Sequence, residues 1–478
     1  MKFDLSKFIG QVKLENVTLK VSETLFKKFK LEKLLKECEI TKDKGSPIIL
    51  LLTIMLLTML SGSRSVYCGI KNSLWKKYKN PISTMLNNAY YDWDKLLYKI
   101  AIIYSKLHSN KADEFSIIFD DSSKKKFGFK TEFSGIFWDH CSKNIFWGFQ
   151  NVVMGFYDGV RCIPLAFASK IGKKKIKKAK RAKAPRGSRI AKKITLSKKQ
   201  KNEICIEMLK EAIKQKIRFA KVIWDTWFTN NTTMSYVFGE LVPRGIHMVG
   251  MLKKSAQKFK LNDLFLDFKE LYHKAGVWQI DEETGIKFKT IIVGLLDTKS
   301  AHRIKDRTVL GQIKICFYRY PGVRKYKMII TTDLKLSALE VLSVYLRRWS
   351  IEVMFRDLKM YFGYDQYKTS KYCAMNSDLS IRCIFYILFC HRKEMENYKS
   401  TEECVFNFFN EISELVFYEI IELVLKKKLF NLLDKAEQMG YKTISELKAN
   451  LDNFLELYFK NEWYVDKIVD ISCVKNSA

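Results

Sequence analysis

The stretch YLRRWSIEVMFRDLK, which runs from Tyr345 to Lys359, decides how the rest of this chain is interpreted. It contains no Gly or Pro and is rich in long unbranched side chains, so it is predicted to form one continuous helix. At about 100° per residue, four of its polar side chains fall within one sector of roughly 60°, and they are Tyr345, Arg348, Glu352 and Lys359. An apolar stripe beside this sector is expected to pack on a core, and it consists of Leu342, Leu346, Trp349, Val353 and Met360.

The polar sector combines one carboxylate with a phenol, a guanidinium and an ammonium. A carboxylate such as Glu352 binds hard divalent cations, and cationic side chains bind phosphate. The sector therefore predicts a division of labour, with Glu352 serving a metal and the other three residues serving a phosphate-bearing ligand. Two simpler interpretations are a solvated helix edge, and an Arg348 that pairs with a nearby acid and holds the helix in place.

The spacing of these four residues resembles the signature of DDE transposases of the insertion-sequence-four type. Two, three and six residues separate Tyr345, Arg348, Glu352 and Lys359 in turn, and the RWSIE and FRDLK segments are also similar to that family. The resemblance implies an RNase H-like catalytic core in which Glu352 is the third metal-binding carboxylate. It also requires two upstream aspartates, each at the end of a strand.

Two β-prone runs meet this requirement. Residues 115–119 are followed by Asp120 and Asp121, and residues 219–224 are followed by Asp225 in a DTWF segment that resembles the second-aspartate motif. Asp120 and Asp121 point to opposite faces of a strand, and Asp120 is preferred as the first acid with Asp121 as the alternative. A plain turn is the simpler interpretation of the Asp pair, because Asp favours turns.

The resemblance implies a specific chemistry for these acids. Asp120, Asp225 and Glu352 would hold Mg²⁺ or Mn²⁺, with two ions expected, for cleavage at transposon ends and strand transfer into target DNA. Tyr345 and its two cationic neighbours on the stretch would hold phosphates beside the scissile bond. The expected partners are double-stranded DNA and a second copy of the chain, in a homodimer or higher oligomer. A non-catalytic DNA-binding protein derived from such an enzyme is the alternative.

Composition points independently to an acidic partner. The 478 residues carry a formal net charge of +34, which suits nucleic acid or an anionic membrane surface. Residues 170–201 contain no acid, and half of them are Lys or Arg. This segment is predicted to be a flexible basic loop that clamps DNA, and the alternative is a solvated loop. Its candidate phosphate-binding residues are Lys173, Lys174, Lys175, Lys177 and Lys178.

Cysteine usage favours a cytoplasmic protein, and the family resemblance implies a prokaryotic one that associates with the nucleoid through DNA. The 11 cysteines are odd in number and contain no Cys-x-x-Cys pair, which suits a reducing compartment. The apolar run over residues 47–60 is too short to cross a bilayer and is expected to be a buried helix, so no membrane is predicted.

The predicted fold class is α/β, a mixed sheet flanked by helices with a β-rich insertion and helical regions at both ends. The N-terminal region is compatible with a helix-turn-helix DNA-end reader and equally with a plain helical bundle. The predicted regions are 1–108 (helical, DNA ends), 109–252 (first part of the core), 253–332 (β-rich insertion), 333–395 (signature helix and end of the core) and 396–478 (helical, possible self-association).

The expected elements follow from apolar periodicity and turn signals. Helices are expected over residues 25–38, 48–60, 196–216, 229–241, 381–389, 423–433 and 444–458. Strands are expected over residues 115–119, 145–156, 161–168, 219–224, 246–252, 288–295, 310–319 and 325–330.

Overall fold

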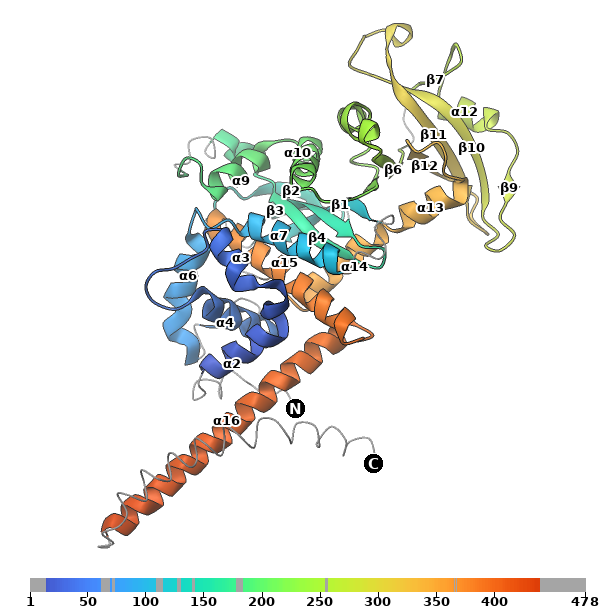
Figure 1. Ribbon diagram of the computed structural model, residues 1–478. Helices are drawn as coiled ribbons and strands as arrows, with labels where there is room; N and C mark the ends of the chain where they lie inside the picture. Colours follow the sequence, from blue (N-terminus) through green and yellow to red (C-terminus); the bar gives the residue numbers. More distant parts are fainter. Residues whose placement is uncertain are drawn as a thin grey trace.

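The computed structural model describes residues 14–61, 69–70, 74–108, 115–126, 130–139, 142–177, 184–253, 257–364, 366 and 368–438. One 12-stranded mixed sheet runs through these residues, and helices flank it (Figure 1). The α/β class predicted from the sequence is therefore confirmed. The strands are β1 (Ser116–Lys125), β2 (Gly135–Asp139), β3 (Asn144–Tyr157), β4 (Cys162–Ser169), β5 (Lys221–Trp224), β6 (His247–Met251), β7 (Phe259–Leu261), β8 (Leu264–Leu266), β9 (Gln279–Ile280), β10 (Lys287–Leu296), β11 (Val309–Arg319) and β12 (Lys327–Thr331).

The strand order is β2-β3-β1-β5-β6-β12-β11-β10-β7-β8, with β4 also on β3 and β9 on β10. Strands β1, β3 and β4 pair antiparallel, whereas β1, β5 and β6 pair parallel. Seven of the eight predicted strands are confirmed to within about two residues, the usual uncertainty of an element boundary. Four short strands, β2, β7, β8 and β9, were not predicted from the sequence, and β2 forms a hairpin with the start of β3.

The first predicted strand was too short, because β1 continues past both acids to Lys125. Its parallel pairing with β5 ends at Ile118, but its antiparallel pairing with β3 continues, with Asp120 opposite Val153 and Asp121 opposite Val152. The long partner strand supplies hydrogen bonds to β1 beyond the acids. The Asp pair is therefore inside a strand, at the point where only one neighbour remains.

The strands after β6 extend the same sheet. Strand β12 pairs with both β6 and β11, so the β-rich region from residue 257 onward continues the sheet by hydrogen bonding (Figure 1). One helix, α12 (Phe268–Lys274), packs there and begins with a capping box between Asp267 and Glu270.

The N-terminal helices form a layer that contacts the sheet through α7, which packs against β4. They are α2 (Leu14–Val21), η2 (Ser22–Phe26), η3 (Lys27–Phe29), α3 (Leu31–Glu37), α4 (Ile48–Leu60), η4 (Leu74–Tyr78), α6 (Lys79–Asn87) and α7 (Trp93–Leu107). The buried helix predicted over 48–60 is confirmed as α4. The single helix predicted over 25–38 is wrong, because Lys30 adopts a left-handed backbone (φ 51°) that ends one helix before the next begins.

Helix α15 (Tyr372–Met395) lies at the centre of the helical layer and packs against α6, α7 and β4. Among the described residues it is the one helix whose length and hydropathy would allow it to cross a membrane, and almost all of that stretch is buried within the protein. This burial is typical of a core helix.

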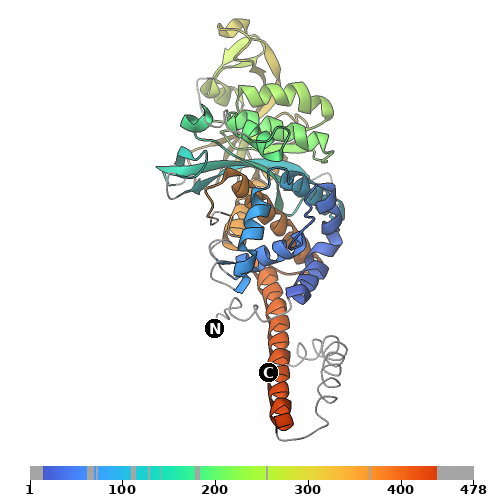
Figure 2. The ribbon, with the colours of Figure 1, turned by 90° about the vertical axis from the view of Figure 1, so that its left-hand side faces the viewer.

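Helix α16 (Thr401–Gln438) follows α15 and includes the predicted helix over 423–433. Cys404, Phe408 and Ile412 are buried in the core, and beyond them the helix extends away from the rest of the protein (Figures 1 and 2). The helix predicted over 444–458 lies outside the described residues.

The basic segment is not a flexible loop over its whole length. Its second half forms α9 (Arg189–Lys198), capped by Ser188, and α10 (Lys201–Lys214) follows after a break. The prediction of one continuous helix over 196–216 was therefore wrong, and the buried face of α10 contains Ile204, Met208 and Leu209. The helix predicted over 229–241 is confirmed in position as α11 (Asn231–Tyr236) with η7 (Val237–Leu241).

Candidate functional site

The predicted signature helix is two helices, α13 (Ala338–Leu346) and α14 (Trp349–Met360). The link between them is tightened by short hydrogen-bonded turns. The backbone N–H of Arg348 donates to the carbonyl oxygen of Tyr345 at 3.0 Å. The backbone N–H of Ile351 donates to the carbonyl oxygen of Arg348 at 3.2 Å. Side chains three residues apart eclipse in such turns, so Tyr345 and Arg348 still share a face. The prediction of one continuous helix was therefore wrong, but Tyr345 and Arg348 still lie on the same face, as predicted.

The predicted apolar stripe was also wrong. Leu346, Trp349 and Met360 are 56%, 64% and 63% exposed, whereas Leu342 is buried as predicted. The face of α14 that packs inward, toward β4 and β1, contains Ile351, Met354, Phe355, Asp357 and Leu358. The stretch has two sets of apolar residues at helical spacing. The set that packs against the sheet is not the one that the helical wheel placed beside the polar sector.

Arg348 connects two of the three predicted acids. Its Nη1 lies 3.5 Å from Oδ2 of Asp120, and its Nη2 donates to Oε1 of Glu352 at 2.5 Å. The three side chains are half-buried, with 20%, 22% and 35% of their surfaces exposed for Arg348, Asp120 and Glu352. Strand β1 and helix α14 therefore bring Asp120 and Glu352 to different nitrogens of one guanidinium.

Asp225 follows β5 directly, as predicted, on the strand parallel to β1. Because Ile118 pairs with Ile223, extending both strands by two residues brings Asp120 and Asp225 to the same edge.

Burial raises the pKa of Asp120 to about 7, and the negative charges of Asp121 and Asp225 add to this increase. The N–H of Asp121 and the charge of Arg348 act in the opposite direction. The surroundings of Asp120 therefore disfavour its charged form.

Tyr345 lies beside the same acids. It is 8% exposed, and burial raises the pKa of its phenol to about 12. The charge of Arg348 lowers that pKa, whereas the charges of Asp225 and Asp120 raise it. The phenol is therefore neutral at physiological pH, and it borders the acid cluster as a hydrogen-bonding group.

The two neighbouring aspartates face different surroundings. Asp121 forms an ion pair with Lys201 at the start of α10, and its Oδ2 accepts a hydrogen bond from Nε2 of Gln150 at 3.0 Å. Asp120 lies on the α14 side with Glu352. Neither Lys201 nor Gln150 was singled out from the sequence, because nothing in one-dimensional spacing connects them to Asp121.

The remaining predicted phosphate-binding residues lie further away. Lys359 is in the last turn of α14, about two turns (~10 Å) along the helix from Glu352. Lys173, Lys174 and Lys175 form a short turn, η6, that follows β4 and packs against β2. Lys177 is exposed just beyond that turn, and Lys178 lies outside the described residues.

The basic segment is anchored by a buried network that the sequence analysis did not identify. Asp94 of α7 accepts from Nε of Arg189 and from Nζ of Lys193, both at 2.9 Å. Ser377 and Ser380 of α15 complete the contacts of Arg189 at 3.1 Å each. Burial alone would raise the pKa of Asp94, but the two cations lower it well below its usual value. The i, i+4 spacing of the two cations is the available signal in the sequence, but it lies within the segment predicted to be a loop.

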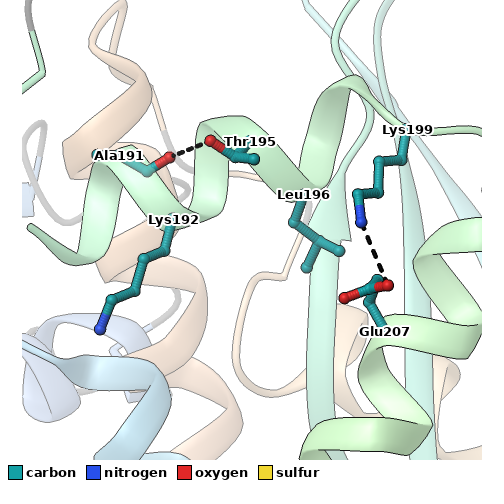
Figure 3. Close-up of a pocket in the computed structure, with 6 residues that line it drawn as sticks. All are labelled: Ala191, Lys192, Thr195, Leu196, Lys199 and Glu207. Atoms are coloured by element: carbon teal, nitrogen blue, oxygen red, sulfur yellow. Dashed lines mark hydrogen bonds and ion pairs between the residues drawn. The ribbon is translucent and has the colours of Figure 1, made fainter. Parts of the chain in front are cut away.

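A pocket of about 370 Å³ lies between α9 and α10 (Figure 3). Its lining residues are Ala191, Lys192, Thr195, Leu196, Lys199 and Glu207. Lys199 and Glu207 form an ion pair across it at 3.2 Å. None of the three predicted catalytic acids lines this pocket, so it is separate from the cluster around Arg348.

The donor chemistry of the acid cluster fits a hard divalent cation, because carboxylate oxygens are the ligands that Mg²⁺ and Mn²⁺ prefer. As the side chains stand, the described residues contain no group of three His, Cys, Asp or Glu close enough to hold a metal ion. Arg348 occupies the space between Asp120 and Glu352. A divalent ion held by Asp120 and Glu352 would therefore require that guanidinium to move.

No protein-family model matches this chain, and no curated protein matches it either. The family resemblance therefore rests on the quoted motifs.

Proposed function

We propose that this protein is a DDE-type DNA transposase that cuts at transposon ends and joins them to target DNA by metal-dependent phosphoryl transfer. The observation that carries the proposal is the meeting of Asp120 and Glu352 on Arg348, with Asp225 at the adjacent strand end. These residues come from β1, α14 and the end of β5, which are far apart in the sequence. A motif match alone would not require them to converge.

The sheet topology supports an RNase H-like core. Three antiparallel strands, β4-β3-β1, continue into two parallel strands, β5 and β6. The resemblance implies a mixed sheet of this kind with the first two acids on neighbouring strands. Asp120 and Asp225 meet that expectation, since β1 and β5 are adjacent.

In the proposed reaction, Asp120, Asp225 and Glu352 would hold the divalent ions. Such ions supply an activated water or 3′-hydroxyl and stabilise the leaving oxygen. Tyr345 would donate a hydrogen bond to a phosphate oxygen, because its phenol stays protonated. Arg348 would grip a phosphate with two parallel N–H groups, and Lys359 would act as a point charge further along the duplex.

The test is cleavage of a supercoiled plasmid that carries the DNA flanking this reading frame. Wild-type protein is expected to nick it in Mg²⁺ and to stop when EDTA is added. Glu352→Gln removes the charge with little change of shape, so it is expected to lose cleavage while keeping DNA affinity. Cleavage by Glu352→Gln at the wild-type rate in Mg²⁺ would contradict the proposed metal site.

A non-catalytic DNA-binding protein derived from such an enzyme remains the second candidate. The observation in its favour is that Arg348 already pairs with two of the acids. It predicts DNA binding by the wild-type protein without any metal-dependent nicking, so the plasmid assay separates the two candidates.

The basic segment is proposed to supply non-specific DNA affinity. Replacing Lys173 and Lys174, both exposed, by Gln should flatten the slope of log K against log salt by about one unit for each lost phosphate contact. The reduction should be equal on end-containing and random duplexes, since phosphate contacts carry no sequence information. Filter binding or fluorescence anisotropy over a salt series measures it. The matched control replaces the exposed Lys210 and Lys214 of α10, and an equal slope change in both variants would refute a specific role for the segment.

Other parts of the proposal follow from the family resemblance. The N-terminal helices would read the transposon ends, the extended helix α16 would take part in a homodimer or higher oligomer, and the protein would act in a prokaryotic cytoplasm on the nucleoid. Residues 253–332 would form the β-rich insertion between the second and third acids.

A further inference from the structure

Arg348 is the shared counter-ion of two acids. Among the described residues it is the one ion-pair partner of Asp120 and also the one ion-pair partner of Glu352. It uses different nitrogens for the two contacts, Nη1 toward Asp120 and Nη2 toward Glu352. A guanidinium has a planar fork of donors, so it can join two carboxylates in the way that a bridging cation does.

The backbone fixes this bridge in position. Arg348 precedes the first turn of α14, and the short turns on both sides of it leave little freedom in its backbone. Glu352 lies one turn later on the same helix, which is the spacing at which side chains meet. Asp120 enters from β1, so the guanidinium is enclosed by a strand and a helix that belong to one core.

Arg348 cannot pair with the two acids and bind a DNA phosphate at the same time. While its Nη1 and Nη2 are directed at Asp120 and Glu352, the same fork cannot also hold a DNA phosphate in bidentate fashion. A divalent ion that enters the cluster would meet a positive charge between its two ligands. A phosphate that approaches would compete with the carboxylates for the guanidinium.

We propose that Arg348 is a built-in competitor of the metal, held on the acids in the DNA-free protein and drawn off them by a DNA phosphate. This inference rests on the proposed function, and it adds a coupling to it: DNA binding releases the acids for metal, and metal binding releases Arg348 for DNA. By linkage the two effects are equal in magnitude. The protein would thereby keep its metal affinity low until DNA is in place.

The experiment measures Mn²⁺ affinity without any turnover. Free Mn²⁺ is followed by electron paramagnetic resonance as it is titrated into full-length wild-type protein, Arg348→Ala and Arg348→Gln, each with and without a short duplex. The Gln variant keeps a side chain of similar reach without the charge, so the test survives if the Ala variant fails to fold. Arg356→Ala is the matched control, because Arg356 is an exposed arginine of the same helix that pairs with Asp357.

Without DNA, both Arg348 variants are expected to bind Mn²⁺ about tenfold more tightly than the wild type, within the usual range of such couplings. Arg356→Ala is expected to match the wild type. The duplex should tighten Mn²⁺ binding to the wild type, and this gain should be smaller in the Arg348 variants, since their acids are already released.

Unchanged or weaker Mn²⁺ binding by both Arg348 variants without DNA overturns the competitor role and leaves the proposed function standing. An equal effect from Arg356→Ala also overturns it, because the effect would then come from general charge. If no variant binds Mn²⁺ with or without the duplex, the proposed function itself fails, and the inference fails with it.

Discussion

Asp120→Asn is expected to abolish metal-dependent DNA cleavage, whereas Asp121→Asn is expected to keep most of it. Asp120 lies with Glu352 on the α14 side, and Asp121 is directed to Lys201 and Gln150. Loss of a metal-binding carboxylate removes several kcal/mol of transition-state stabilisation, which is about 10³-fold in rate. The Asp121 change breaks an ion pair that is still in contact with water, and it should cost at most about tenfold in rate.

The measurement is the initial rate of plasmid nicking in Mg²⁺ for the two variants, normalised to the folded fraction. Both variants remove one negative charge from adjacent residues, so each is the other's control. DNA affinity should not fall in either variant, because each loses a negative charge and neither loses a proposed phosphate contact. The reverse ranking would make Asp121 the first acid, and equal wild-type rates would contradict an acid at either position.

Asp94→Asn is expected to lower the free energy of unfolding by about 3–5 kcal/mol, the cost of leaving buried cations without their partner. Arg189 and Lys193 are only 2% and 6% exposed at their side chains, and Asp94 is the carboxylate that both contact. Because the cations depress the pKa of Asp94 in the folded state, its contribution is fully present above the unfolded value of about 3.9. It is lost as the pH falls through the depressed value, so the comparison is made at pH 7.

Urea denaturation of both proteins measures this effect. Glu37→Gln is the matched control, because Glu37 pairs with Lys99 of the same helix α7 at an exposed site. Exposed pairs contribute about 0–1 kcal/mol, so the control should be close to the wild type. A loss below about 1 kcal/mol for Asp94→Asn would mean that water or another group compensates the two cations. The network also links α9 to α7 and α15, so its loss should loosen the anchored end of the basic segment.

Local chemistry made the strands and the acids predictable. The runs around residues 145–156, 219–224 and 310–319 are rich in β-branched and aromatic side chains bounded by turn residues, and each forms a strand where expected. Asp225 at the end of β5 follows from the same reasoning. Strand β2 was missed because Trp138 and Ile136 are exposed on a short hairpin, so no buried alternation marks it.

Local chemistry was not sufficient for the stretch from Tyr345 to Lys359. Its composition determined that it is helical and that Tyr345, Arg348 and Glu352 share a face. It did not determine which apolar line is buried, because two lines at helical spacing satisfy the same wheel. Packing of Ile351, Met354 and Leu358 toward the sheet decided that choice and left Trp349 and Leu346 exposed.

The sequence alone determined the α/β fold class, the large positive charge, and the order of the acids and cations along the chain. Only the tertiary structure decided which of these meet. Asp120 is directed to α14 and Asp121 to α10 because the two faces of β1 are covered by different helices. Arg348 lies between Asp120 and Glu352 because the strand and the helix pack together, and spacing along the chain carries no information about such a contact.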